Sequence, residues 1–197
     1  MSGSGATVRS SSKREALLDA AEALFARQGY RAVGIDTVLA RAGVAKMTLY
    51  KHFGSKEELI AAVLERRAET IAASLAQRIA AAPAPPRERL LAVFDWLEAA
   101  VRSPGFHGCL FLKAASEYPA ADDLPRQVAL GFKERCRRLL EGLCRDVGAG
   151  DPEGLARQLQ LLFEGALMMA FLQRNPQAAS DARQAVVTLL GAAEATT

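Results

Sequence analysis

The segment "GVAKMTLYKHFGSKEEL", residues 43–59, decides the fold, because it contains a tight turn, a short helix and the start of another helix. Gly43 suits the turn, since a residue without a Cβ adopts positive φ at little cost. Ser55 and Glu58 have the spacing of a capping box, in which side chains accept backbone N–H groups at a helix start. The segment therefore predicts a short helix between a glycine turn and a longer helix.

The short helix, predicted over residues 46–52, has two different faces. Leu49 and Phe53 are spaced i, i+4, so both would pack inward. The other side chains would point outward or sideways: Lys46, Met47, Thr48, Tyr50, Lys51 and His52. An ordinary solvated surface is one interpretation of this face. The lysines beside a turn glycine and a following helix start favour the other, a surface that binds a polyanion.

Two more helices are predicted before this segment. Ser12 and Glu15 have capping-box spacing, so the first helix is predicted to begin at Ser12 and to end at Gly29. A short second helix is predicted over residues 35–41. Three helices, the last two joined by a glycine turn, are typical of a helix-turn-helix unit. The last helix of such a unit can enter the major groove of DNA, which is wide enough to admit it.

Helical periodicity continues through the rest of the chain, and no segment shows the alternation typical of a strand. Prolines in "APAPP" form a corner, and Asp151 followed by Pro152 has the pattern of a helix start. We therefore predict an all-α protein with about nine helices. Those that follow the helix-turn-helix cover residues 55–80, 87–102, 108–117, 124–147, 152 to the "NP" at 175–176, and from there to about 193.

Composition sets further expectations. The chain has 197 residues, of which 50% are hydrophobic and 24% charged, as is usual for folded soluble proteins. Charges interrupt the apolar runs before they reach ~18 residues, so no membrane span is expected. The start, "MSGSGATVRSSSK", lacks the apolar centre of a secretory signal, so we expect a cytoplasmic protein. Cys109, Cys136 and Cys144 have no metal-site spacing, so reduced thiols are expected, with no metal and no cofactor.

Charge is unevenly distributed along the sequence. Residues 1–56 carry nine Lys or Arg against four Asp or Glu, whereas the remaining residues carry sixteen against eighteen. A basic N-terminal part on a mildly acidic body indicates a polyanionic partner at that end.

Four short motifs in this region resemble the TetR-type (TetR/AcrR-like) transcriptional repressors. They are Gly29-Tyr30 after the first helix, Ala42-Gly43-Val44 at the turn, "TLYKHF" at 48–53 and "SKEEL" at 55–59. The resemblance covers about the first 65 residues. Gly34 and Ala45 depart from it, because a Ser or Thr cap is common at both places, and so does Met47, where a small residue is usual.

The resemblance implies a homeodomain-like helix-turn-helix domain over residues 12–54. The polar, Ser/Gly-rich composition of residues 1–11 predicts a disordered tail in front of it. It also implies which side chains touch double-stranded DNA. Lys46, Met47 and Thr48 would face bases, Tyr50, His52 and Lys56 would hold phosphates, Lys51 would do either, and Thr37 would contact the backbone. Met47 in the groove would suit a thymine methyl.

The remaining helices, residues 55–197, would form a ligand-binding and dimerisation domain. A bridging helix over 55–80 would join this domain to the helix-turn-helix domain. The resemblance implies a homodimer through the last two helices, on a palindromic operator, with repression as the usual outcome. Packing within the subunit's own core is the alternative for these apolar side chains. The predicted dimer residues are Leu155, Leu159, Leu162, Ala166, Met169, Val186, Val187 and Leu190.

The middle helices offer an apolar lining for a small apolar or aromatic effector. The predicted lining residues are Phe94, Trp96, Leu97, Phe106, His107, Cys109, Phe111, Phe132, Phe163 and Met168. Each of them also suits an ordinary core. A helical enzyme and a partner-binding scaffold are the alternative functions, although "FHGC" lacks the third group that a Cys–His pair needs for catalysis. A redox switch of the cysteines is a further alternative.

Overall fold

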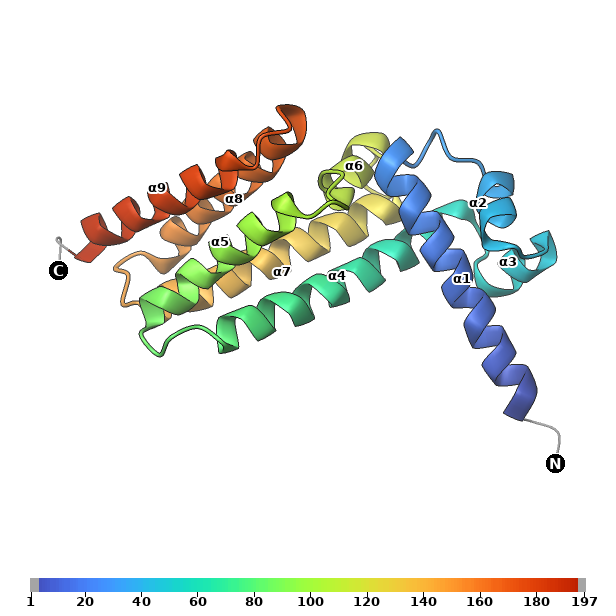
Figure 1. Cartoon of the computed structure of the whole chain (residues 1–197), viewed down its shortest axis with the longest axis horizontal. Helices are drawn as coiled ribbons and strands as arrows, with labels where there is room; N and C mark the ends of the chain where they lie inside the picture. Colours follow the sequence, from blue (N-terminus) through green and yellow to red (C-terminus); the bar gives the residue numbers. More distant parts are fainter. Residues whose placement is uncertain (1–3, 195–197) are drawn as a thin grey trace. The chain divides into compact units, whose positions relative to one another are not determined.

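The computed structural model of the chain describes the backbone of residues 4–194 and the side chains of residues 12–191. Within that part there are nine α-helices and no strand, which confirms the predicted all-α fold (Figure 1). The helices are α1 (Ser4–Gln28), α2 (Ile35–Ala42), α3 (Lys46–His52), α4 (Lys56–Ala80), α5 (Pro86–Arg102), α6 (Leu110–Glu117), α7 (Leu124–Asp146), α8 (Pro152–Leu172) and α9 (Gln177–Glu194).

Two helix starts differ from the prediction. Helix α1 begins at Ser4, so Ser12 lies inside the helix and not at its N-cap. No proline precedes Ser12, and serine disfavours a helix interior by only about half a kcal/mol relative to alanine. Of the tail predicted over residues 1–11, residues 1–3 lie outside the described part, as do the side chains of the others. Helix α6 begins at Leu110 and not at residue 108, because Gly108 has φ +83, outside the right-handed helical region.

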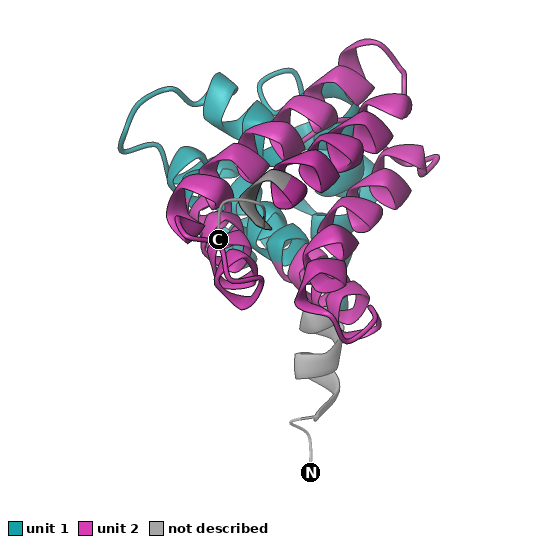
Figure 2. Ribbon diagram, turned by 90° about the vertical axis from the view of Figure 1, so that its left-hand side faces the viewer, with its two compact units in different colours: residues 1–68, 110–130 teal, residues 69–109, 131–197 magenta. Residues whose placement is uncertain are grey.

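The chain forms two compact units (Figure 2). The first takes in residues up to Ala68 together with residues 110–130, and the second takes in residues 69–109 and 131 onward. Helices α4 and α7 each contribute residues to both units. The first unit therefore contains α6 in addition to the predicted helix-turn-helix.

In the first unit, α1 packs against α2 and α3. Leu49 and Phe53 of the α3 region are buried, as predicted from their spacing, and Val38 of α2 is buried with them. The side chains of Leu24 and Phe25 complete this small core from α1. Burying one face of α3 fixes the direction in which its other face points.

In the second unit, α5, α8 and α9 pack against one another, and α8 runs beside α9 (Figure 1). Helix α5 buries an apolar stripe at helical spacing, and its members are Leu90, Phe94, Leu97 and Val101. In α7, an apolar stripe that continues from Phe132 and Cys136 could pass through either Leu139 or Leu140. Leu139 is exposed, and Leu140 is buried in its place. Steps of three and four residues both follow a helix face, and here α7 takes the longer step from Cys136.

Candidate nucleic-acid interface

The turn between α2 and α3 has the geometry that the glycine predicted. Gly43 has φ 65 and ψ 34, in the left-handed region, and its backbone N–H donates to the carbonyl oxygen of Leu39. A residue with a Cβ would be strained at this φ. Gly34 and Ala45 precede the two helices in extended conformation, and neither start has a side-chain cap. Sequence reasoning had identified both positions as departures from a good cap.

The outward face of α3 is well exposed. Met47 is 80% exposed and Tyr50 is 48% exposed, large values for apolar or aromatic side chains. Lys46 and Lys51 are also exposed, whereas Thr48 and His52 are half-buried. Basic groups thus flank two large side chains that the protein's own core does not take up.

Helix α2 contributes two side chains beside α3. Thr37 is exposed in the first turn of α2. Asp36 precedes it, and its Oδ1 lies 3.9 Å from Nζ of Lys46. Both groups of this ion pair are exposed, so it stabilises the fold little. Its effect is to hold Lys46 near the N-terminus of α2. Sequence reasoning did not single out Asp36, because only the fold brings it opposite Lys46.

The start of α4 has the predicted capping interactions. The backbone N–H of Glu58 donates to Oγ of Ser55 at 3.1 Å, and Oε2 of Glu58 accepts the N–H of Gly54 at 2.8 Å. Lys56 is the first residue of the helix. Burial lowers the pKa of the Lys56 ammonium, while the carboxylates of Glu57 and Glu117 act in the opposite direction. A helix N-terminus with a lysine in its first turn favours a phosphate.

The predicted ligand-binding residues occupy two kinds of position. Phe94, Leu97, Phe111 and Phe132 are buried, and Trp96, Phe106, His107, Cys109, Phe163 and Met168 are half-buried. Phe111 belongs to the first compact unit, whereas the other nine residues belong to the second. Trp96 stacks on Phe163, with ring centroids 6.4 Å apart and planes 12° apart. Its indole N–H donates to Oγ of Ser74 at 2.9 Å, so α4 already satisfies it.

A polar pair lies among these apolar side chains. Nζ of Lys133 on α7 is 2.5 Å from Oε1 of Glu164 on α8. Burial alone would lower the pKa of Lys133, but the nearby Cys109 and Glu164 outweigh it and raise the pKa. Sequence reasoning missed this pair. Its only signal was a lysine next to Phe132 on the apolar side of α7.

Two of the cysteines, Cys136 and Cys144, are poorly suited to redox sensing in this state. Burial raises the pKa of Cys136 to about 11 and that of Cys144 to about 11. The reactive form of a cysteine is the thiolate, so both side chains are weak nucleophiles at neutral pH. A redox switch that uses Cys136 or Cys144 therefore has little chemical support.

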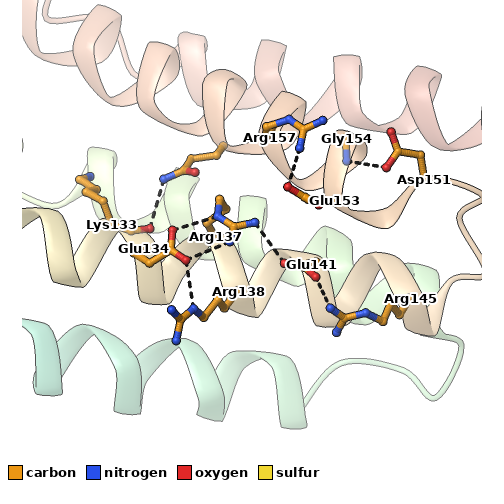
Figure 3. Close-up of polar contacts among 11 residues, drawn as sticks. Lys133, Glu134, Arg137, Arg138, Glu141, Arg145, Asp151, Glu153, Gly154 and Arg157 are labelled. Atoms are coloured by element: carbon orange, nitrogen blue, oxygen red, sulfur yellow. Dashed lines mark hydrogen bonds and ion pairs between the residues drawn. The ribbon is translucent and has the colours of Figure 1, made fainter.

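Three arginines of α7 are paired with carboxylates of the same helix (Figure 3). Arg137 bonds Glu134 and Glu141 on its own helix, Arg138 bonds Glu134, and Arg145 bonds Glu141. Hydrogen bonds from Arg137 and Arg138 lower the pKa of Glu134 to about 2. Because two glutamates partly neutralise these three arginines, the arginines are weaker candidates for binding a polyanion than the lysines of α3.

The predicted dimer residues on α8 and α9 divide by burial. Leu155, Leu159, Ala166, Val186 and Leu190 lie in the subunit's own core, Leu162 and Val187 are half-buried, and Met169 is exposed. A different apolar stripe faces solvent on α8. Leu161 is 73% exposed, Leu172 is 65% exposed, and Gly165 is exposed between them. In length and composition α8 would suit a membrane span. Only 22% of its most apolar 18-residue stretch is buried within the subunit.

Two sequence profiles of known families match the chain. The profile described as "Bacterial regulatory proteins, tetR family" matches residues 17–63, and "Tetracyclin repressor-like, C-terminal domain" matches residues 86–186. The crystal structure of a TetR-family transcriptional regulator from Streptomyces coelicolor is similar, with a TM-score of 0.88 and 32% identity. The similarity covers 93% of this chain and 96% of that one.

Two relatives from Mycolicibacterium smegmatis are similar over a shorter stretch. The HTH-type transcriptional activator FasR is 40% identical over 90 residues, which are 44% of this chain and 41% of that protein. The HTH-type transcriptional repressor KstR is 41% identical over 78 residues, which are 40% of this chain and 38% of that protein. The chain thus matches less than half the length of each. Their names give opposite directions of regulation.

Proposed function

Because the chain belongs to the TetR family of bacterial regulatory proteins, we propose that it is a cytoplasmic, homodimeric repressor on a palindromic operator, released by a small apolar or aromatic effector. Members of this family are DNA-binding transcriptional regulators and not enzymes, which removes the helical enzyme as an alternative. They are dimeric and bind small-molecule effectors. Repression is supported by the description of the C-terminal profile as repressor-like.

The exposed face of α3 is the observation that carries this proposal. Lys46 and Met47 would read base edges from the first turn, with Thr48 beside them, and Lys51 would contact either a base or a phosphate. The groups that would hold phosphates are Tyr50, His52, Lys56 and, from α2, Thr37. Phosphate contacts set affinity and its dependence on salt, whereas base contacts set sequence preference.

The second copy of the chain would cover α8. Burying the exposed stripe that contains Leu161, Gly165, Met169 and Leu172 would lower the free energy by roughly 25 cal/mol per Å² of apolar surface. Gly165 would let a partner helix approach closely. This assignment explains the apolarity of α8 as a protein interface. Two copies related by a two-fold axis would present two α3 helices to half-sites about one DNA turn apart, or multiples of it.

The effector would bind in the second unit, next to Trp96 and Phe163. The apolar side chains there suit an apolar or aromatic molecule, and the Lys133–Glu164 pair would meet one polar group of it. An effector releases DNA only to the extent that it binds the DNA-free conformation more tightly than the DNA-bound one.

Selection of duplexes by the wild-type protein from a random-sequence library tests the DNA part. We expect enriched sequences that contain an inverted repeat and an affinity that falls steeply with salt. The double variant Lys46→Ala, Lys51→Ala should bind the selected duplex at least about tenfold more weakly, because it removes two cations from the face proposed to meet DNA. Arg138→Ala, which removes an exposed charge from α7, is the matched control and should bind normally. Failure to enrich any duplex would contradict the proposal.

A thermal-shift screen of apolar and aromatic compounds tests the effector part. A compound that binds should raise the melting temperature and weaken binding to the selected duplex. Trp96 is the only tryptophan of the chain, so its fluorescence reports directly on this region. A compound that stabilises the protein but leaves both DNA affinity and Trp96 emission unchanged would argue against this effector site.

A further inference from the structure

Glu117, the last residue of α6, holds the segment that follows α1. Its Oε1 accepts the backbone N–H of Tyr30 at 3.1 Å, and its Oε2 accepts the backbone N–H of Arg31 at 2.6 Å. Both oxygens of one carboxylate are therefore used by consecutive amides. Hydrogen bonds of backbone amides to an ionised carboxylate are about twice as strong as those to a neutral acceptor.

Three further bonds join α6 to the same segment. Nε of Arg31 donates to the carbonyl oxygen of Glu117 at 2.6 Å. The hydroxyl of Tyr30 donates to the carbonyl oxygen of Leu110 at 3.0 Å. Nζ of Lys113 donates to the carbonyl oxygen of Ala26 at 2.6 Å. The beginning, middle and end of α6 are thus all bonded to the chain between residues 26 and 31.

The local backbone is shaped to admit the carboxylate. Gly29 has φ +82, and a Cβ on it would lie 2.6 Å from Oε1 of Glu117. A side chain at this position would be strained by its φ and would also displace the carboxylate. Glycine here ends α1 and leaves room for a residue from α6.

This segment leads directly into α2, which carries Thr37, and then into the turn before α3. The charges of Glu117 and Arg31 also act on Lys56, the first residue of α4. Burial lowers the pKa of Lys56, and Glu117 and Arg31 are among the charges that act on it, in opposite directions. The amides that Glu117 holds therefore lie between α1 and the helices proposed to meet DNA.

We propose that Glu117 is a positioning residue for operator binding, since its carboxylate fixes the Tyr30–Arg31 amides and thereby the entry into α2 and α3. The inference rests on the proposed function. It assigns a role to a residue 86 positions after Arg31 in the chain. Operator affinity then depends on the docking of α6 as well as on the side chains that touch DNA. Because α6 directly follows residues 106–109, whose Phe106, His107 and Cys109 are predicted effector residues, the bonds from Glu117 to the Tyr30 and Arg31 amides offer a route for regulation.

Glu117→Gln is the test, with Glu153→Gln on α8 as the matched control. A glutamine keeps the shape but presents one N–H₂ group where a backbone N–H donates, so one of the two bonds is lost. We expect the E117Q protein to bind the duplex selected by the wild-type protein roughly tenfold more weakly, the scale of one charge-assisted hydrogen bond. Glu153 pairs with Arg157 at the helix surface, and its substitution should leave the affinity unchanged.

Amide hydrogen exchange supplies a readout that a general loss of stability would not give. In E117Q the amides of Tyr30 and Arg31 should exchange about tenfold faster, while that of Phe53, bonded to Leu49, stays protected. Lys113→Met, which loosens α6 without touching these amides, should weaken operator binding in the same direction by a smaller factor.

Three results would overturn the inference. One is normal operator affinity in E117Q despite faster exchange at Tyr30 and Arg31. Another is an E117Q protein that does not fold, which would make Glu117 a residue of stability and not of positioning. The third is a wild-type protein that selects no duplex, which would overturn the proposed function as well and is thereby distinguishable from the first two.

Discussion

Helices α3 and α8 both leave large apolar side chains in solvent, but the charges around those side chains differ. On α3, Met47 and Tyr50 are interleaved with Lys46 and Lys51. On α8, Leu161, Met169 and Leu172 are exposed, and the one charged residue between Leu161 and Leu172, Glu164, is paired with Lys133 of α7. The two helices therefore combine similar apolar exposure with opposite electrostatic settings.

This difference teaches what kind of partner each surface suits. A polyanion such as DNA gains most from cations that displace its counterions, and large side chains add groove contacts. An uncharged apolar stripe gains little from DNA and much from another apolar surface. The charge pattern thus distinguishes a reading surface from an assembly surface on one chain.

The largest expected effect is on assembly. Leu161→Asp would place an unpaired carboxylate in the proposed α8 interface, where burying it costs several kcal/mol. We expect the variant to sediment as a monomer and to bind the selected duplex at least about a hundredfold more weakly. The reason is that a monomer has one helix-turn-helix domain, whereas the dimer has two linked ones. Sedimentation velocity and a gel-shift titration measure these two results.

Leu130→Asp is the matched control for that variant. Leu130 is also an exposed leucine, but it lies on α7, outside the proposed interface. It should leave both the sedimentation and the DNA affinity unchanged. A dimeric L161D protein would show that α8 is not the assembly surface.

The next effect separates the two faces of α3. Leu49 is fully buried, so Leu49→Ala should lower the free energy of unfolding by about 2–5 kcal/mol. Met47→Ala removes a similar volume from an exposed position and should change it by less than about 0.5 kcal/mol. Denaturant titrations at equal protein concentration measure both. Equal losses would mean that Met47 packs in the core.

Much of this contrast could be predicted from local sequence. The i, i+4 spacing of Leu49 and Phe53 and the glycine at position 43 gave the turn, the buried face and the exposed face of α3. Ser55 and Glu58 gave the start of α4, because a capping box involves neighbours in the chain. Local interactions determine these features, so the local sequence carries the signal.

Features that depend on distant residues were not predictable. Both apolar faces of α8 read alike, so Leu159 and Leu161 could be assigned to core or surface only after α5 and α9 had been placed. The Glu117 carboxylate and the amides it holds are separated by more than eighty residues, and no spacing rule connects them. The start of α1 was missed for another reason, since a capping-box pattern also occurs inside helices.

A smaller effect sharpens the assignment of DNA contacts. Lys56→Ala removes a phosphate contact, so it should weaken binding to all duplexes alike, by roughly threefold to tenfold, and lower the salt slope by about one. Met47→Ala should instead change the preference at one base position, where a thymine methyl is the expected contact. Competition titrations against single-base variants of the selected duplex distinguish the two. A sequence-selective loss in K56A would reverse the roles.

The smallest expected effect concerns the N-cap of α8, which stabilises this helix within a single subunit. Oδ1 of Asp151 accepts the backbone N–H of Gly154 at 2.9 Å and so caps the helix. Asp151→Ala should lower the free energy of unfolding by about 1 kcal/mol, the usual value of an N-cap. Asp181→Ala, on the exposed side of α9, should cost less. Because the cap lies outside the stripe that contains Leu161 and Leu172, D151A should sediment as a dimer like the wild-type protein. A monomeric D151A would mean that the first turn of α8, and not its apolar stripe, holds the two copies together.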